Sequence, residues 1–226
     1  LPGTADKQAV INETKRNAFN KAVLTEVGES AEKATPDVLN AARTRIGGEF
    51  DRLTQSNQIA MSDDFFNALV KVDSSRNEFT NPAVKTAVDK AVSLLARAEK
   101  NRGQISGEDY QRIRSTLGKA ADDAFKSSNS ELAQALKAIK RALDSDARNS
   151  LPAAEKAAWD KASRQWQNLK IVERAAAPNS ADAVAGNVSP SKLATALLST
   201  DRQGYTYGTR TDNMGELARV GQAFVK

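Results

Sequence analysis

Apolar residues recur along most of the chain at intervals of three and four positions, the spacing that places them on one face of an α-helix. Four segments show such stripes clearly: Leu39, Ala42, Ile46, Phe50 and Leu53; Tyr110, Ile113, Leu117 and Ala121; Leu132, Leu136, Ile139 and Leu143; and Trp159, Ala162, Trp166 and Leu169. No segment of useful length alternates apolar with polar residues. The pattern therefore predicts an all-α protein without a sheet.

Start and stop signals divide this pattern into separate helices. Thr35 and Ser62 stand where N-caps are expected, and Pro36 and Pro152 stand in first turns, where the missing N–H costs nothing. The predicted helices cover approximately residues 5–26, 35–53, 62–72, 81–98, 108–126, 128–147, 151–175, 191–198 and 214–225. Residues 199–215 are predicted to be a loop with Gly and Tyr.

Short turns between the long helices after residue 107 favour antiparallel packing. We expect a bundle of long antiparallel helices with an N-terminal helical subdomain and a less regular C-terminal tail. The predicted division is 1–76 for the subdomain, 77–177 for the main bundle, and 178–226 for an exposed linker, short helices and the loop, docked on the bundle.

Two local features qualify this picture. Gly47 and Gly48 interrupt a helical stripe, and each lowers helix propensity by about 1 kcal/mol, which predicts a close helix crossing or a kink. The last helix has Leu217, Val220 and Phe224 on one side and is too short to be stable alone.

The composition excludes several kinds of site. The 226 residues include neither cysteine nor histidine, which removes disulfides, thiolate catalysis and Ser-His chemistry. No carboxylate loop typical of calcium sites is found, so we expect neither metal nor cofactor and no enzymatic activity. No apolar run reaches the roughly 18 residues that cross a bilayer. The chain starts at Leu1, and we expect it to be part of a longer protein.

Two short motifs resemble catalytic ones. The pair Glu29-Ser30 is found in lytic transglycosylases, but the other segments of that family are missing, so an interhelix turn is the better interpretation. Ser189 to Lys192 fits the S-x-x-K pattern without its companion motifs, so Ser189 is predicted to be a helix cap.

The net charge of +5 and the pI near 9.4 permit contact with nucleic acid without requiring it. Charges of both signs are interspersed, and most are predicted to lie on a solvated surface. Two groups would contact DNA or phosphate if any does. They are Arg112, Arg114, Lys137, Lys140 and Arg141 on helices, and Arg202, Tyr205, Tyr207 and Arg210 in the loop. The aromatic rings of this loop would stack on single-stranded bases, but a tyrosine loop folded over the bundle is the better interpretation. Such binding would be non-specific and sensitive to salt.

Several segments, in their order along the chain, resemble a helical region of a known family. They are "FNKAVLTEVGESAEKATPDVLNAARTRIGGEFDRL", "ISGEDYQRIRSTLGKAADDA", "ALKAIKRALDSDA", "WDKASRQWQNLKIVERA", "VSPSKLATAL" and "MGELARVGQAF". The family is that of the internal virion or DNA-transfer (ejection, pilot) proteins of short-tailed phages. The shared features are packing and turn signatures, so no functional residue is carried over.

The resemblance implies a non-enzymatic structural and assembly module of a phage virion protein. Such a protein would lie in the virion interior, leave with the genome, and help DNA transfer through the host cell envelope and periplasm. Its implied partners are copies of itself, other ejection proteins and the portal. Self-association would require an apolar stripe that stays exposed after the bundle closes. The alternatives are a non-specific DNA-binding module and, third, a carboxylate-based cell-wall hydrolase fragment, which needs two acids facing each other in a cleft.

Overall fold

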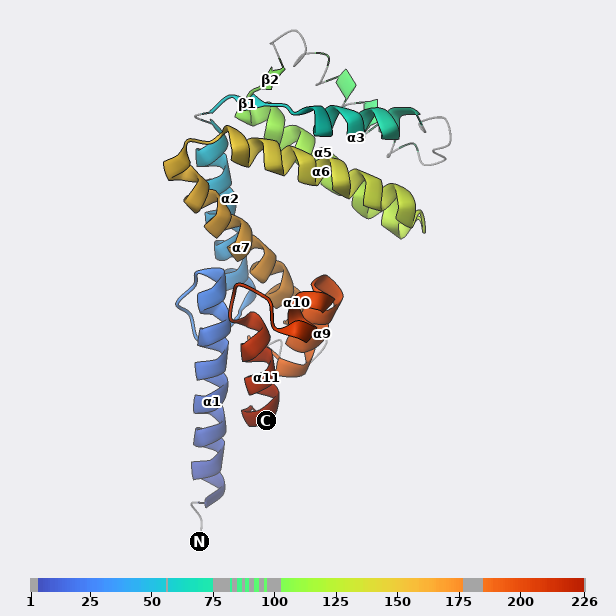
Figure 1. Cartoon of the computed structure of the whole chain (residues 1–226). Coiled ribbons are helices and arrows are strands. Elements are labelled where there is room, and N and C mark those ends of the chain that lie inside the picture. Colours follow the sequence, from blue (N-terminus) through green and yellow to red (C-terminus); the bar gives the residue numbers. More distant parts are fainter. Residues whose placement is uncertain are drawn as a thin grey trace. The chain divides into compact units, whose positions relative to one another are not determined.

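The computed structural model describes residues 4–55, 57–74, 103–176 and 185–225, with residues 82, 85, 86, 88, 89, 92, 93 and 96 between them. Most of these residues are helical, which confirms the predicted all-α fold (Figure 1). The helices are α1 (Thr4–Val27), α2 (Pro36–Gln55), α3 (Asp63–Ser74), α5 (Gly107–Lys126), α6 (Ser130–Ser150), α7 (Ala153–Ala175), α9 (Pro190–Thr200), α10 (Arg202–Tyr207) and α11 (Met214–Phe224). Most of the predicted helix of residues 81–98 lies outside the described residues.

The prediction that the chain has no sheet is wrong in one detail. Strand β1 (Ile59–Ala60) pairs antiparallel with β2 (Gln104–Ile105), and the buried residues Ile59 and Ile105 lie opposite each other. Strands of two residues are too short to show an alternating pattern, so the sequence carries no signal for them. The pairing joins the segment after α2 to the turn before α5.

The chain forms two compact units. The first unit consists of Leu1–Gly48 and Asp160–Lys226, and the second unit is Glu49–Trp159. This division differs from the predicted boundaries after residues 76 and 177. The reason is that α2 and α7 each contribute residues to both units, so the boundaries fall within helices rather than in the turns between them.

The second unit is built around α5 and α6, which lie side by side and antiparallel (Figure 1). Their predicted stripes are confirmed, because all eight side chains are buried. An aromatic cluster extends this core: the ring of Trp159 meets that of Phe50 edge-on at 4.9 Å and lies 6.1 Å from that of Tyr110. Aromatic contacts at these distances add to the stability that burial gives.

The first unit holds α1, α9, α10 and α11. Helices α1 and α11 are antiparallel neighbours: Asn213 donates a hydrogen bond to Glu26, while a Cβ atom at Gly221 would lie 2.5 Å from the Phe19 ring. Gly28 ends α1 in the left-handed region, at φ 88°, where the side chains of Gln165 and Arg45 leave no room for a Cβ. Both glycines therefore stand where a neighbouring side chain leaves no room for a Cβ.

The C-terminal tail is more ordered than expected. The predicted loop contains α10, which begins where Asp201 accepts a hydrogen bond from the Gly204 N–H. The prediction of an exposed linker is wrong for residues 186–188, because Gly186 and Val188 are buried and the Val188 N–H donates to Asn20. Residues 177–184 of that linker lie outside the described residues.

Helix α11 buries a different face from the one its large side chains indicate. Its buried residues are Met214, Gly215, Ala218 and Gly221. Leu217 is half-buried, whereas Val220 and Phe224 are exposed to 47% and 66%. Gly221 permits close packing against Phe19 of α1 and Pro190 of α9, and Met214 is buried, while Val220 and Phe224 remain on the outside.

The glycines of α2 and α11 respond differently to a methyl group. A Cβ at Gly48 would meet nothing within 4 Å, so the predicted close crossing is absent there. Gly48→Ala should therefore stabilise the protein by about 0.5–1 kcal/mol through helix propensity. Gly221→Ala should destabilise it by about 1–3 kcal/mol, because its Cβ would overlap the Phe19 ring. Urea unfolding followed by circular dichroism measures both, and equal effects would contradict this packing.

Candidate interaction surfaces

A hollow of about 510 Å³ on the second unit is lined by cations. Among the residues that the structure describes, its lining consists of Gln134, Lys137, Lys140 and Arg141, all on α6. The exposed ring of Phe125, at the end of α5, lies 5.6 Å from the Lys137 ammonium. We call this surface, with Phe125, the basic hollow. Three of the residues predicted to contact phosphate therefore lie together at this surface.

Arg114 is linked to the basic hollow because it and Lys140 bind the same carboxylate, that of Asp144. Asp144 accepts hydrogen bonds from the Arg114 Nε at 2.7 Å and from the Lys140 Nζ at 3.1 Å. It also accepts one from the buried Tyr110 hydroxyl at 2.8 Å. The Arg114 guanidinium stacks over the Phe50 ring. Arg114 therefore serves the interior of the unit more than its surface.

Arg112 does not join these cations. Residues two positions apart on a helix face different directions, and Arg112 turns away from Arg114. It forms ion pairs with Glu108 at 2.6 Å and with Asp109 at 3.7 Å on its own helix. Such exposed pairs contribute little to stability, but they reduce the positive charge that Arg112 presents to an anion.

The pKa values of Tyr110 and Arg114, two of the partners of Asp144, are both shifted. Burial and the negative charge of Asp144 raise the pKa of Tyr110 far above its ordinary value. Burial alone would lower the pKa of Arg114, but Asp144 and Tyr110 together raise it above its ordinary value. Tyr110 therefore stays neutral and Arg114 stays charged at neutral pH, as the hydrogen bonds to Asp144 require.

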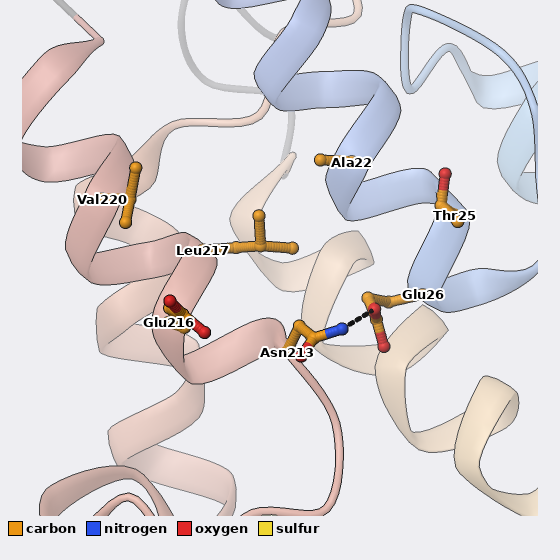
Figure 2. A pocket seen from close by; sticks show the side chains of 7 residues that line it. All are labelled: Ala22, Thr25, Glu26, Asn213, Glu216, Leu217 and Val220. Carbon is orange, nitrogen blue, oxygen red and sulfur yellow. Dashed lines mark hydrogen bonds between the residues drawn. The ribbon is translucent and has the colours of Figure 1, made fainter.

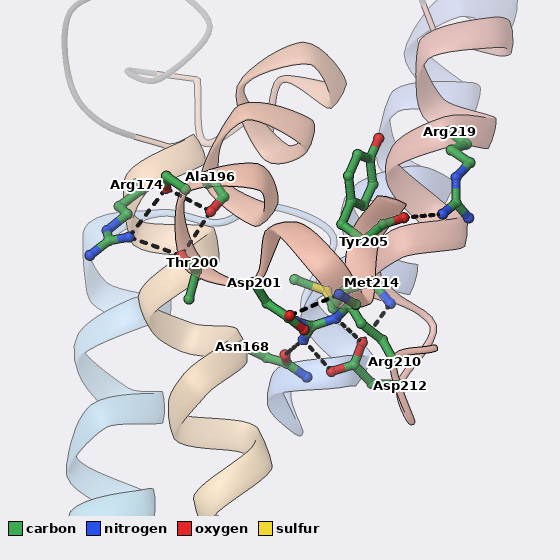
Figure 3. A network of polar contacts seen from close by, with 12 residues as sticks. Asn168, Arg174, Ala196, Thr200, Asp201, Tyr205, Arg210, Asp212, Met214 and Arg219 are labelled. Atoms are coloured by element: carbon green, nitrogen blue, oxygen red, sulfur yellow. Dashed lines mark hydrogen bonds and ion pairs between the residues drawn. The ribbon is translucent and has the colours of Figure 1, made fainter. Parts of the chain in front are cut away.

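Within the loop of residues 199–215, Arg210 makes internal contacts (Figure 3). Arg210, whose side chain is only 9% exposed, forms ion pairs with Asp212 at 2.6 Å and Asp201 at 3.1 Å. It also donates a hydrogen bond to Asn168 of α7. Burial alone would lower the pKa of Arg210, but the two carboxylates raise it. These contacts fasten the C-terminal tail to α7.

The other residues of this group do not form a common face for bases. The ring of Tyr205 lies under the Arg219 guanidinium, and its backbone carbonyl accepts a hydrogen bond from Arg219. Arg202 and Tyr207 are exposed. The four residues are thus divided between internal contacts and the surface, rather than arranged as one stacking platform.

A second hollow, of about 370 Å³, lies on the first unit between α1 and α11 (Figure 2). Leu217, Val220 and Ala22 form its apolar part, and Glu26 and Glu216 supply two carboxylates. Thr25 and Asn213 complete the lining, and Asn213 donates a hydrogen bond of 2.9 Å to Glu26. We call this surface, with Phe224 one turn beyond Val220, the acidic hollow. It was not predicted, because its two helices lie at opposite ends of the chain.

The two motifs that resemble catalytic ones have structural roles. Glu29 lies in the turn after α1, as predicted, and forms an ion pair with Arg45 at 3.0 Å. The Ser189 hydroxyl caps α9 by accepting a hydrogen bond from the Lys192 N–H, and Pro190 follows in the first turn. Both interpretations made from the sequence are confirmed.

Within the ranges described above, no group of three acidic side chains is placed to hold a metal ion. None of the helices in those ranges has the length and apolar character to span a membrane. Comparison with protein-family models, with curated proteins and with solved structures finds no match to this chain. The two hollows are therefore interpreted from their own chemistry.

The raised pKa of Tyr110 predicts a loss of stability at alkaline pH. The stability from the neutral hydroxyl is fully present below the unfolded-state pKa of about 10 and declines as the pH rises above it. The free energy of unfolding should fall by up to about 1.4 kcal/mol per pH unit there. Tyr110→Phe should cost about 1 kcal/mol at pH 8 and remove this part of the decline. Urea unfolding at pH 8 and at about pH 11 measures it; an equal decline in both proteins would contradict the account.

Proposed function

We propose that this chain is a non-enzymatic structural module that assembles with copies of itself. The observation that carries the proposal is the outer face of α11, where Leu217, Val220 and Phe224 stay partly or largely exposed. A helix of a monomeric protein normally buries its largest apolar residues, and exposed apolar groups of this kind mark protein interfaces. Here α11 buries Met214 with three small residues, Gly215, Ala218 and Gly221, while Val220 and Phe224 stay exposed and are available to a partner.

The biological setting of the proposal rests on the resemblance to internal virion and DNA-ejection proteins of short-tailed phages. The segments that carry it form α1, α2, α5, α6, α7, α9 and α11. In this setting the module lies in the virion interior and helps DNA transfer when the genome is ejected into the host envelope. Other ejection proteins and the portal are the proposed further partners.

A second candidate function is non-specific binding of DNA through the basic hollow. Lys137 and Arg141 line it, and in the part of the chain that the structure describes neither forms an ion pair. Most of the other arginines predicted to contact phosphate are paired with carboxylates. Cations that are not already ion-paired can neutralise phosphates and so release the counterions of a DNA backbone, which favours binding.

Self-association is tested by sedimentation velocity at roughly 1–100 µM protein. The weight-average mass should rise with concentration. Val220→Ser with Phe224→Ser should weaken association at least tenfold, because both remove apolar area from the proposed interface. Val70→Ser on α3 is the matched control, since Val70 is as exposed as Phe224 and belongs to neither hollow. A monomer at every concentration would refute the proposal.

DNA binding is tested by fluorescence anisotropy with single- and double-stranded DNA of unrelated sequences. At about 50 mM salt we expect micromolar binding that is lost at about 200 mM. Lys137→Ala with Arg141→Ala should weaken it, whereas Arg112→Ala should have a smaller effect because Arg112 is already paired. Absence of binding at the lower salt concentration would eliminate this second candidate.

A further inference from the structure

The two hollows have opposite charge and similar apolar character. In the acidic hollow, neither Glu26 nor Glu216 is ion-paired with any residue that the structure describes. The nearby Arg219 is turned towards the Tyr205 ring and carbonyl. The carboxylates therefore stand beside exposed apolar side chains without a cation of their own.

The basic hollow presents the complementary set. Phe125 is 66% exposed, and the Lys137 ammonium lies over its ring. Arg141 lines the same hollow, again without an ion pair among the described residues. Lys140 is already paired with Asp144, so Lys137 and Arg141 are the cations left for a partner.

We infer that the acidic hollow of one copy binds the basic hollow of a second copy. Phe125 of the second copy would cover Leu217 and Val220, while its Lys137 and Arg141 would pair with Glu26 and Glu216. This inference rests on the proposed self-association and names the two surfaces that carry it. It also gives the basic hollow a protein partner in place of DNA.

Three physical arguments support this pairing over contact between identical surfaces. Two acidic hollows brought together would place four carboxylates in contact, and two basic hollows would do the same for cations; like charges that face each other oppose association. Contact between an acidic and a basic hollow instead brings the carboxylates of one copy to the cations of the other. Lys137 already lies over Phe125, so the ring and the cation reach the partner as one unit with little further ordering. Each exposed aromatic ring also buries a large apolar area on binding.

Because the two surfaces are different, the contact is head-to-tail. Each copy keeps one acidic or one basic hollow free after the first contact forms. Such contacts extend into an open filament, or into a ring if the rotation closes. The expected assemblies are therefore larger than dimers, and their size increases with protein concentration.

The inference is tested with two charge-reversed variants of the full chain. Glu216→Lys makes the acidic hollow less negative, and Glu216 is exposed, so the fold should be retained. Lys137→Glu with Arg141→Glu makes the basic hollow acidic. Each variant alone should associate at least tenfold more weakly than the parent. Mixed together they should recover one contact of parental strength, because the intact basic hollow of Glu216→Lys can bind the intact acidic hollow of the other variant.

Sedimentation velocity and circular dichroism on the parent, each variant and the mixture separate the outcomes. A monomeric parent would refute the proposed self-association itself. A parent that assembles, with folded variants that assemble equally well, would keep self-association and overturn the pairing of the two hollows. Weak association of both variants with no recovery in the mixture would also overturn it. Arg112→Glu is the matched control and should leave assembly unchanged.

Discussion

Each long helix of this chain has to bury one apolar stripe, because the composition offers little else to hold the helices together. Only 5% of the residues are aromatic and there is no cysteine, so burial of Leu, Ile, Val and Ala supplies most of the stabilisation. In the second unit, α5 and α6 bury their apolar stripes against each other. Three aromatic residues add to this core where Phe50, Tyr110 and Trp159 meet.

Helix α11 is where this constraint is met in an unusual way. Its close contact with α1 depends on Gly221 facing the Phe19 ring, and a larger residue would separate the helices. The buried face therefore carries Gly215, Ala218 and Gly221 beside Met214. The consequence is an exposed face of larger residues, and the proposed assembly is what would cover it. The fold and the proposed function are thus linked through one helix.

The sequence was sufficient for the stripes, for most helix bounds and for the caps at Ser62 and Ser189, because these depend on local spacing. It was insufficient for α11, because either of two apolar faces would satisfy the pattern, and a long-range contact with Phe19 decides between them. The burial of Arg210 depends in part on a long-range contact. Its partner Asn168 lies 42 positions away, so the flanking residues, which include Asp212, do not indicate the whole of its environment. Arg112 and Arg114 differ in their partners. Arg114 pairs with Asp144 on another helix, whereas Arg112 pairs with Glu108 on its own helix.

Two classes of charge matter here: those that hold the fold and those that are proposed to bind a partner. Arg114 and Arg210 belong to the first class, since both are largely buried against carboxylates. Lys137, Arg141, Glu26 and Glu216 belong to the second. Their division between a basic and an acidic surface, each beside exposed apolar side chains, is the central claim of this account.

The absence of cysteine makes that claim directly testable by disulfide trapping. Thr25→Cys and Gln134→Cys, each prepared as a single-cysteine protein, place one thiol in each hollow without removing a side chain of the proposed contact, and a disulfide requires Cα atoms within about 7 Å. Under mild oxidation the mixture should form the cross-link between the two different variants, while each variant alone should form almost none. Equal cross-linking in the separate variants and in the mixture would contradict head-to-tail assembly.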